Sequence, residues 1–125
     1  MEIMPSEFVH KIHDAVIERT GGAHGCINPV YVESAVQRPL TAFGGVELFP
    51  TVFAKAAAIA HSIATTHPFA DGNKRTALFC AAAVLAQAGM VLIADDEVLE
   101  QTMVGLATSQ TSLAEFAAFL EQHAV

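Results

Sequence analysis

Apolar residues recur at intervals of three and four along most of this chain, the spacing that places them on one face of an α-helix. In the first segment this face holds Phe8, Ile12, Ala15 and Val16, and two glycines follow it. The pattern predicts helices over about 6–20, 29–38, 51–66, 73–88 and 95–109, and a last one from residue 112 onward. The expected fold class is therefore all-α, a compact bundle of about six helices.

Three of the helix starts carry additional signals. Asn28 followed by Pro29 is typical of an N-cap and a first helical position. The acidic run 95–97 suits the positive end of a helix dipole. Ser112 with Glu115 three residues later is the signature of a capping box.

The segment after residue 72 is the most apolar part of the chain. Residues 76–94 carry no charged side chain, and a run of this length could span a bilayer. Gln87 and Gly89 interrupt the run, and charged residues flank it on both sides. We therefore favour a buried central helix over 73–88 and expect no membrane association.

Residues 39–50 differ from their surroundings, because they hold two aromatic residues and a Gly-Gly pair between prolines. Such a segment predicts a small β-hairpin, or flap. Its central residues are Phe43, Gly44, Gly45, Val46, Glu47 and Leu48. A simple structural role is open to it, as a two-stranded cover over an edge of the core.

Length and composition agree with one domain over residues 1–125, large enough for a hydrophobic core. The formal net charge of −7 argues against direct nucleic-acid binding, which depends on basic surface stripes. Cys26 and Cys80 fit no metal or redox spacing, and the N-terminus lacks the basic and apolar regions of a signal peptide. We expect a cytoplasmic protein with two reduced thiols.

The candidate chemistry is concentrated in residues 67–76, which read His-Pro-Phe-Ala-Asp-Gly-Asn-Lys-Arg-Thr. His67 precedes a proline, so it should end the third helix and present its imidazole as a proton acceptor for a hydroxyl. Phe69 would anchor the loop. Asp71 offers a carboxylate, and Mg²⁺ commonly uses one or two carboxylates together with substrate phosphates.

The second half of this motif has the character of a phosphate site. Gly72 permits a tight turn, and the N–H groups that open the next helix favour an anion. Asn73 adds an amide, while Lys74 and Arg75 make up a third of the six Lys and Arg residues. A proton acceptor, a metal ligand and a phosphate cradle match metal-assisted transfer from a nucleoside triphosphate. The alternative is a helix-capping loop with a buried histidine, which leaves the charged cluster unexplained.

The other histidines suggest no second site. His10 and His13 lie three residues apart and could share a metal ion, but no third ligand is apparent, so we interpret them as ordinary helix-face residues. His61 lies in an apolar helix and is interpreted as a core histidine with its polar atoms satisfied. His24 and His123 are expected in a solvated loop and near the C-terminus.

This motif resembles that of the Fic/Doc family, whose general pattern is His-x-Phe-x-Asp/Glu-Gly-Asn-Gly-Arg-x-x-Arg. The matching positions are His67, Phe69, Asp71, Gly72, Asn73 and Arg75. Lys74 replaces the second Gly and Leu78 the final Arg, which is similar to the death-on-curing (Doc) toxins of type II toxin–antitoxin modules. The similarity covers nearly the whole chain, with a departure at Ile27-Asn28, where Doc-like sequences often have Arg-Asp.

The resemblance implies an enzyme that uses ATP and Mg²⁺ and acts on a Ser or Thr hydroxyl of a protein, elongation factor Tu in Doc toxins. His67 would be the base, Asp71 the Mg²⁺ ligand, and residues 72–75 the phosphate site. The flap would align the target by strand-like pairing. Bulk at Lys74 and the missing Arg at Leu78 favour transfer of the γ-phosphate, with AMP transfer as the alternative. A non-catalytic inhibitor that binds nucleotide or a translation component is the second alternative.

The sequence lacks a motif by which many Fic proteins inhibit themselves. Many Fic proteins carry an inhibitory motif, Ser/Thr-x-x-x-Glu-Gly/Asn, and in this sequence no Glu is followed by Gly or Asn. Self-inhibition by that motif is therefore excluded. The resemblance implies an antitoxin partner of the Phd type, whose disordered tail folds onto the toxin.

Overall fold

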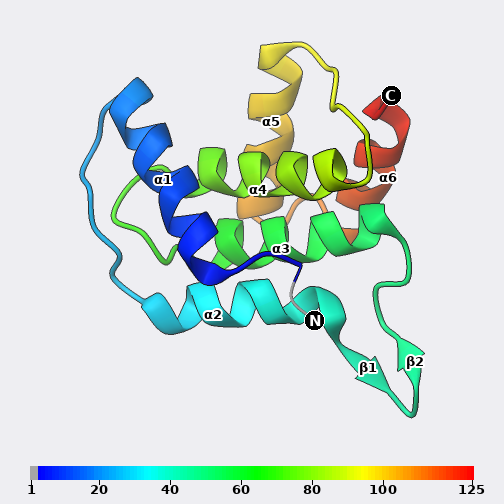
Figure 1. Ribbon diagram of the computed structural model, residues 1–125. Helices are drawn as coiled ribbons and strands as arrows, with labels where there is room; N and C mark the ends of the chain where they lie inside the picture. Colours follow the sequence, from blue (N-terminus) through cyan, green and yellow to red (C-terminus); the bar gives the residue numbers. More distant parts are fainter. Residues whose placement is uncertain (1–2) are drawn as a thin grey trace.

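The computed structural model describes residues 3–125, so the first two residues of the expected domain lie outside the described part (Figure 1). The described chain forms a helical bundle with one hairpin, as the sequence predicts. Its helices are α1 (Ser6–Thr20), α2 (Pro29–Gln37), α3 (Val52–Thr66), α4 (Asn73–Gln87), α5 (Asp96–Ala107) and α6 (Leu113–His123), with a short 3-10 turn η1 (Arg38–Leu40). The hairpin strands are β1 (Ala42–Phe43) and β2 (Val46–Glu47).

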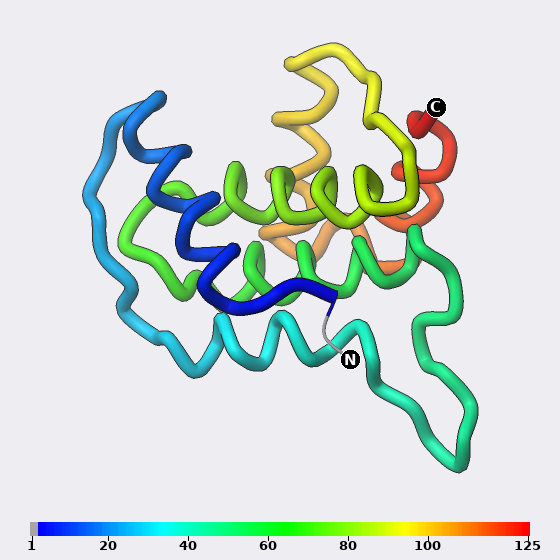
Figure 2. Tube along the Cα trace, viewed as in Figure 1, coloured from blue at the N-terminus to red at the C-terminus, as the bar shows by residue number. Residues whose placement is uncertain are grey.

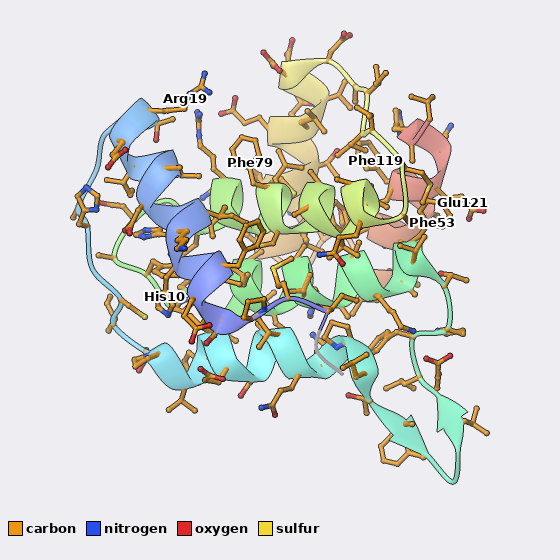
Figure 3. All side chains as sticks on the ribbon, in the orientation of Figure 1. His10, Arg19, Phe53, Phe79, Phe119 and Glu121 are labelled. Atoms are coloured by element: carbon orange, nitrogen blue, oxygen red, sulfur yellow. The ribbon has the colours of Figure 1, made fainter. Side chains whose placement is uncertain are left out.

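Helix α3 occupies the centre of the bundle, where it packs against α2, α4, α5, α6 and η1. Residues 56–60 of α3 are all buried, and four of the five are alanines, whose small side chains let neighbouring helices approach closely. The sequence favours 73–88 as the central helix, but α4 is the less enclosed of the two. Phe79 on its outer side is 52% exposed, between α1 and α5 (Figure 3).

Most helix ends follow the sequence signals. The Ser112 hydroxyl accepts from the Glu115 N–H, and the Glu115 carboxylate accepts from the Ser112 N–H, so the capping box is complete. Pro29 opens α2 as expected, but the Asn28 side chain makes no cap hydrogen bond. Thr51 caps α3 through its hydroxyl, which accepts from the Ala54 N–H.

The buried face of α1 differs from the expected one. The buried residues are Val9, His13, Val16 and Ile17. Phe8 is 40% exposed and Ala15 is exposed, so the prediction of the buried face was wrong. The observed face is rotated about the helix axis relative to the predicted one. A histidine at a core position caused the error, because it was counted as polar.

The hairpin projects away from the helices near the N-terminal end of α3 (Figure 2). Ala42 pairs with Glu47 and Phe43 with Val46, and the two glycines between them have positive φ of 57° and 82°, as a tight hairpin turn requires. All four strand residues are exposed, so the hairpin does not cover the core. Lys55 on α3 holds its base by an ion pair with Glu47 at 3.0 Å.

Of the residues that the structure describes, no helix is long and apolar enough to cross a membrane. The uncharged run at 76–94 is divided, because α4 ends at Gln87 and Gly89 turns the chain with φ +79°. The connector after Gly89 pairs with the other end of the described chain through an antiparallel bridge between Leu92 and Ala124.

Candidate active site

The motif loop (residues 67–72) joins the end of α3 to the start of α4. Its first residue, His67, has φ +50° and ψ +61°, in the left-handed region, and its N–H donates to the Ile63 carbonyl. A residue other than glycine in this region is uncommon and is often found at functional sites. The sequence predicts that α3 ends here, and the His67 side chain is exposed to solvent.

Phe69 fixes the middle of the motif loop in the core, where it is 2% exposed. The imidazole of His13 stacks on its ring with the centroids 3.9 Å apart and the planes 7° apart. His10 meets the same ring edge-on at 5.6 Å. Two histidines of α1 therefore enclose the phenyl ring that holds the loop.

Asn73 closes the motif loop with a pair of hydrogen bonds to the backbone of Phe69. Its Oδ1 accepts from the Phe69 N–H at 3.0 Å, and its Nδ2 donates to the Phe69 carbonyl at 2.9 Å. This side-chain amide therefore stabilises the turn between Phe69 and Asn73. What Asn73 presents toward a ligand at the start of α4 is its backbone N–H.

His13 is the residue of this site whose role the sequence did not reveal. It is 2% exposed, and its Nε2 lies 2.8 Å from the main-chain oxygen of Asp71. A carbonyl only accepts, so Nε2 must carry the proton and donate. In the sequence, its helical spacing from Val9, Val16 and Ile17 indicates a core position.

A second loop, residues 22–28, lies along the motif loop, and we call it the clasp segment (left in Figures 1 and 2). The Ile27 N–H donates to the Pro68 carbonyl at 2.8 Å, and the Ala70 N–H donates to the Gly25 carbonyl at 3.1 Å. Cys26 forms an antiparallel bridge with Phe69. The backbone of the motif loop is therefore held from outside by a segment about 45 residues earlier in the chain.

The clasp segment also positions the carboxylate of Asp71. Its Oδ2 accepts from the Ala23 N–H at 2.8 Å, and the side chain is exposed. A Cβ added at Gly22 would lie 3.2 Å from the Asp71 Cβ, so the close approach requires a small residue there. Asp71 thus has a fixed orientation, with its second oxygen free of protein hydrogen bonds within the described chain.

Gly72 combines two constraints. Its φ of +78° disfavours any side chain, and a Cβ would lie 3.1 Å from Ile17 Cδ1 and 3.3 Å from Val16 Cγ1. The Gly72 carbonyl accepts from the Thr76 N–H at 2.9 Å, which begins the hydrogen bonding of α4. The N–H groups of residues 73–75 precede this first bond and have no partner within the helix.

Lys74 and Arg75 lie on the exposed surface of this helix start. Within residues 3–125 neither belongs to an ion pair, because the pairs found there join Lys55 to Glu47 and His24 to Asp14. Two cations without counter-ions therefore add to the positive end of the α4 dipole. This combination favours an anionic ligand.

The described residues contain no cluster of three or more His, Cys, Asp or Glu side chains that could hold a metal ion. The Nε2 of His13 donates to the Asp71 carbonyl, so that nitrogen is not available to a metal ion. A divalent ion at Asp71 would have one protein carboxylate. This donor set fits Mg²⁺ that arrives with phosphate oxygens, because Mg²⁺ keeps waters and uses few protein ligands in such sites.

The structure does not bring the predicted flap to the motif loop. Residues 43–48 lie at one end of α3 and His67 at the other, and fifteen helical residues separate the ends by about 22 Å. Leu78, which stands at the family's final Arg position, is half-buried and packs against the core. Any side-chain contact from this position to a ligand is therefore apolar.

The remaining histidines have local partners. His61 is half-buried on α3 and its Nδ1 lies 2.8 Å from an Arg38 nitrogen, as a satisfied histidine would. His24 is exposed, 3.7 Å from an Asp14 oxygen. His123 is half-buried near the C-terminus, and its Nδ1 donates to the Phe119 carbonyl.

The helical bundle and this motif loop define a member of the Fic/DOC family, whose pattern matches residues 3–85, and the chain belongs to that family. It is similar to the protein named Toxin Doc of Mycolicibacterium smegmatis, with 40% identity over 91 residues, 71% of this chain and 70% of the relative. It is also similar to the protein named Protein kinase doc of Escherichia phage P1, with 34% identity over 115 residues, 92% of this chain and 89% of the relative.

Proposed function

We propose that this protein is the toxin of a toxin–antitoxin module and that it transfers the γ-phosphoryl group of ATP to a Ser or Thr hydroxyl of a protein. The names of the two relatives described above, one a toxin and the other a protein kinase, support this proposal. The observation that carries it is the arrangement of the motif loop. An exposed histidine stands beside a helix N-terminus that bears two cations without counter-ions.

In this proposal His67 removes the proton from the target hydroxyl. The hydroxyl oxygen bonds to the γ-phosphorus, the bond from that phosphorus to the β–γ bridging oxygen breaks, and ADP leaves. The proton passes to the imidazole. The left-handed backbone of His67 holds this side chain at the surface, where a protein hydroxyl can reach it.

The start of α4 would bind the phosphates. The N–H groups of residues 73–75 and the side chains of Lys74 and Arg75 supply donors and positive charge. Asp71 would hold Mg²⁺, which when bound neutralises charge on the phosphate oxygens. His13 and the clasp segment keep Asp71 in place.

Transfer of the γ-phosphate rather than AMP is supported by two positions. Lys74 adds bulk and charge where the family pattern has a glycine that lets phosphates approach the backbone. Leu78 packs against the core where the pattern has an arginine for the outer phosphates. Both changes alter the way a triphosphate would lie across the loop.

The target we propose is a translation factor, elongation factor Tu, whose modification in the cytoplasm would arrest translation. The hairpin would pair with an extended segment of the target. About seven extended residues span the length of α3, so the paired segment and the modified hydroxyl would be separated by roughly that number. An antitoxin of the Phd type, with a tail that folds on binding, would restrain the activity.

The decisive experiment uses ATP labelled separately at the α- and γ-phosphorus, with purified elongation factor Tu. We expect label from the γ position only and a mass gain of one phosphate. Label from the α position only would replace this proposal with AMP transfer. Transfer from neither position would reject a catalytic role toward this target.

The base role of His67 is tested by His67→Asn, because asparagine tolerates the left-handed backbone but does not accept the proton. We expect at least about a hundredfold loss of transfer. His24→Ala is the matched control and should keep the wild-type rate, because it removes an exposed side chain and leaves the backbone contacts of the clasp segment unchanged. Growth arrest that persists in both His67→Asn and Asp71→Asn would favour a non-catalytic inhibitor.

A further inference from the structure

Arg38 is a half-buried cation held only by neutral groups. It begins η1, and its Nη1 donates to the Nδ1 of His61 at 2.8 Å and to the Oγ of Ser62 at 3.0 Å. Because His61 accepts at Nδ1, its own proton lies on Nε2. The guanidinium carbon lies 5.7 Å from the centre of the Phe49 ring, a cation–π distance.

No carboxylate balances this charge. In the part of the chain that the structure describes, the ion pairs involve Lys55 and His24 and not Arg38. Burial lowers the pKa of Arg38, as expected for a cation that has lost water without gaining an anion. The chain carries 13 acidic residues and a net charge of −7, so the missing partner is not explained by a shortage of carboxylates.

An open cavity of about 440 Å³ lies directly over this side chain. Its lining is Ser34, Gln37, Arg38, Leu40, Thr41 and Ser62. The Ser62 oxygen accepts from Arg38, which leaves the Ser62 O–H to donate elsewhere. Arg38, Ser34, Ser62 and Gln37, which all carry hydrogen-bond donors, thus line the same open cavity.

We propose that this cavity is a second anion site, which binds a phosphoryl group through Arg38, Ser34 and Ser62. An arginine beside hydroxyl donors matches the several oxygens of a phosphoryl group. Hydrogen bonds to the anion would replace the contacts with water that Arg38 lost on burial. The bound anion would contact Arg38, which is hydrogen-bonded to His61 on α3, six residues before the histidine of the motif loop. The site stands on its own geometry and does not depend on the reaction proposed above.

The test is a titration of the ¹⁵N-labelled protein with inorganic phosphate, followed by NMR at constant ionic strength. We expect saturable shifts of the Ser34, Thr41 and Ser62 amides and of the His61 ring, all with one dissociation constant. Arg38→Gln should weaken that binding at least about tenfold, because a charge-assisted hydrogen bond is lost.

Two controls separate this site from the motif loop. Phosphate bound at the start of α4 would change the amide chemical shifts of residues 73–76 with a separate dissociation constant. Arg75→Gln should weaken that binding, and Arg38→Gln should not. Ser62→Ala, which keeps the cation, should weaken the cavity curve several-fold and serves if Arg38→Gln does not fold. The proposal is overturned if the cavity residues do not shift, or if they shift equally with sodium chloride.

Discussion

The imidazole of His13 lies flat against the ring of Phe69, 3.9 Å between centroids, while its Nε2 donates to the carbonyl of Asp71. One residue of α1 therefore fixes two points of the motif loop, its apolar anchor and the peptide that precedes Gly72. His13 touches neither a proposed phosphate nor a hydroxyl. It is a positioning residue, which acts by keeping the Asp71 carboxylate and the first turn of α4 in place.

Replacement of His13 by leucine should loosen the motif loop. Leucine fills a similar volume but lacks the N–H that donates to the Asp71 carbonyl and the ring that stacks on Phe69. We therefore expect the free energy of unfolding, measured in urea, to fall by about 1–3 kcal/mol. We also expect at least about a tenfold fall in phosphoryl transfer at saturating ATP. His10→Leu, which loses only an edge-on ring contact, is the control.

His13→Gln distinguishes the two contributions, because glutamine retains an N–H donor but has no ring. If the hydrogen bond dominates, this variant should recover a large part of the rate that leucine loses. A leucine variant with wild-type stability and wild-type rate would contradict the positioning role.

Gly72→Ala and Gly89→Ala form a matched pair, since the two glycines have φ of +78° and +79°. A Cβ at Gly89 meets nothing within 4 Å, so its substitution should cost only the backbone strain, about 1 kcal/mol. At Gly72 the same strain adds to contacts of 3.1 and 3.3 Å with Ile17 and Val16, and we expect about 1–3 kcal/mol more. Chemical denaturation of both variants measures the difference, and equal costs would refute the steric argument.

Burial, and next the positive charge of Arg38, lower the pKa of His61 below its ordinary value of 6.5. The unfolded chain therefore binds the His61 proton more readily, and this residue's contribution to stability is present above about pH 6.5 and is lost as the pH falls below it. We expect the ring of His61 to titrate below 6.5 by NMR, and Arg38→Gln to raise its pKa part of the way back. A midpoint at or above 6.5 would contradict this prediction.

The two cysteines are both free thiols and should react very differently. Burial raises the pKa of Cys80 to about 12, so almost no thiolate forms there at neutral pH. We expect iodoacetamide to modify the half-buried Cys26 first and Cys80 only at the rate at which the protein unfolds. Peptide mass spectrometry after timed alkylation checks the order, and early labelling of Cys80 would contradict it.

The sequence predicts the helices well because each is specified locally. Helical spacing, the Pro29 start and the Ser112–Glu115 capping box all act within a few residues, and the helix bounds agree within about two positions. The hairpin is equally local, since its two glycines take the positive φ that its turn requires. These elements depend little on the rest of the chain.

The supports of the motif loop are different, because they depend on contacts between distant segments. No periodicity in residues 22–28 indicates that their backbone pairs with Pro68 and Ala70. The core position of His13 is hidden by its residue type, and the use of the Asn73 amide on Phe69 becomes visible only once the loop is folded. The motif residues could be named from the sequence, but the groups that orient them could not.

The clasp segment has a consequence for proteolysis. It carries no helix and its residues are largely exposed, so a protease could cut the chain near Gly25 while the packed interior of α3, α4 and α6 stays intact. Such a nick would free Asp71 and the Pro68 carbonyl from their partners without melting the bundle. On the proposed function, a nicked molecule would keep its circular dichroism spectrum and lose phosphoryl transfer. One broken peptide bond would then separate the folding of the bundle from its activity.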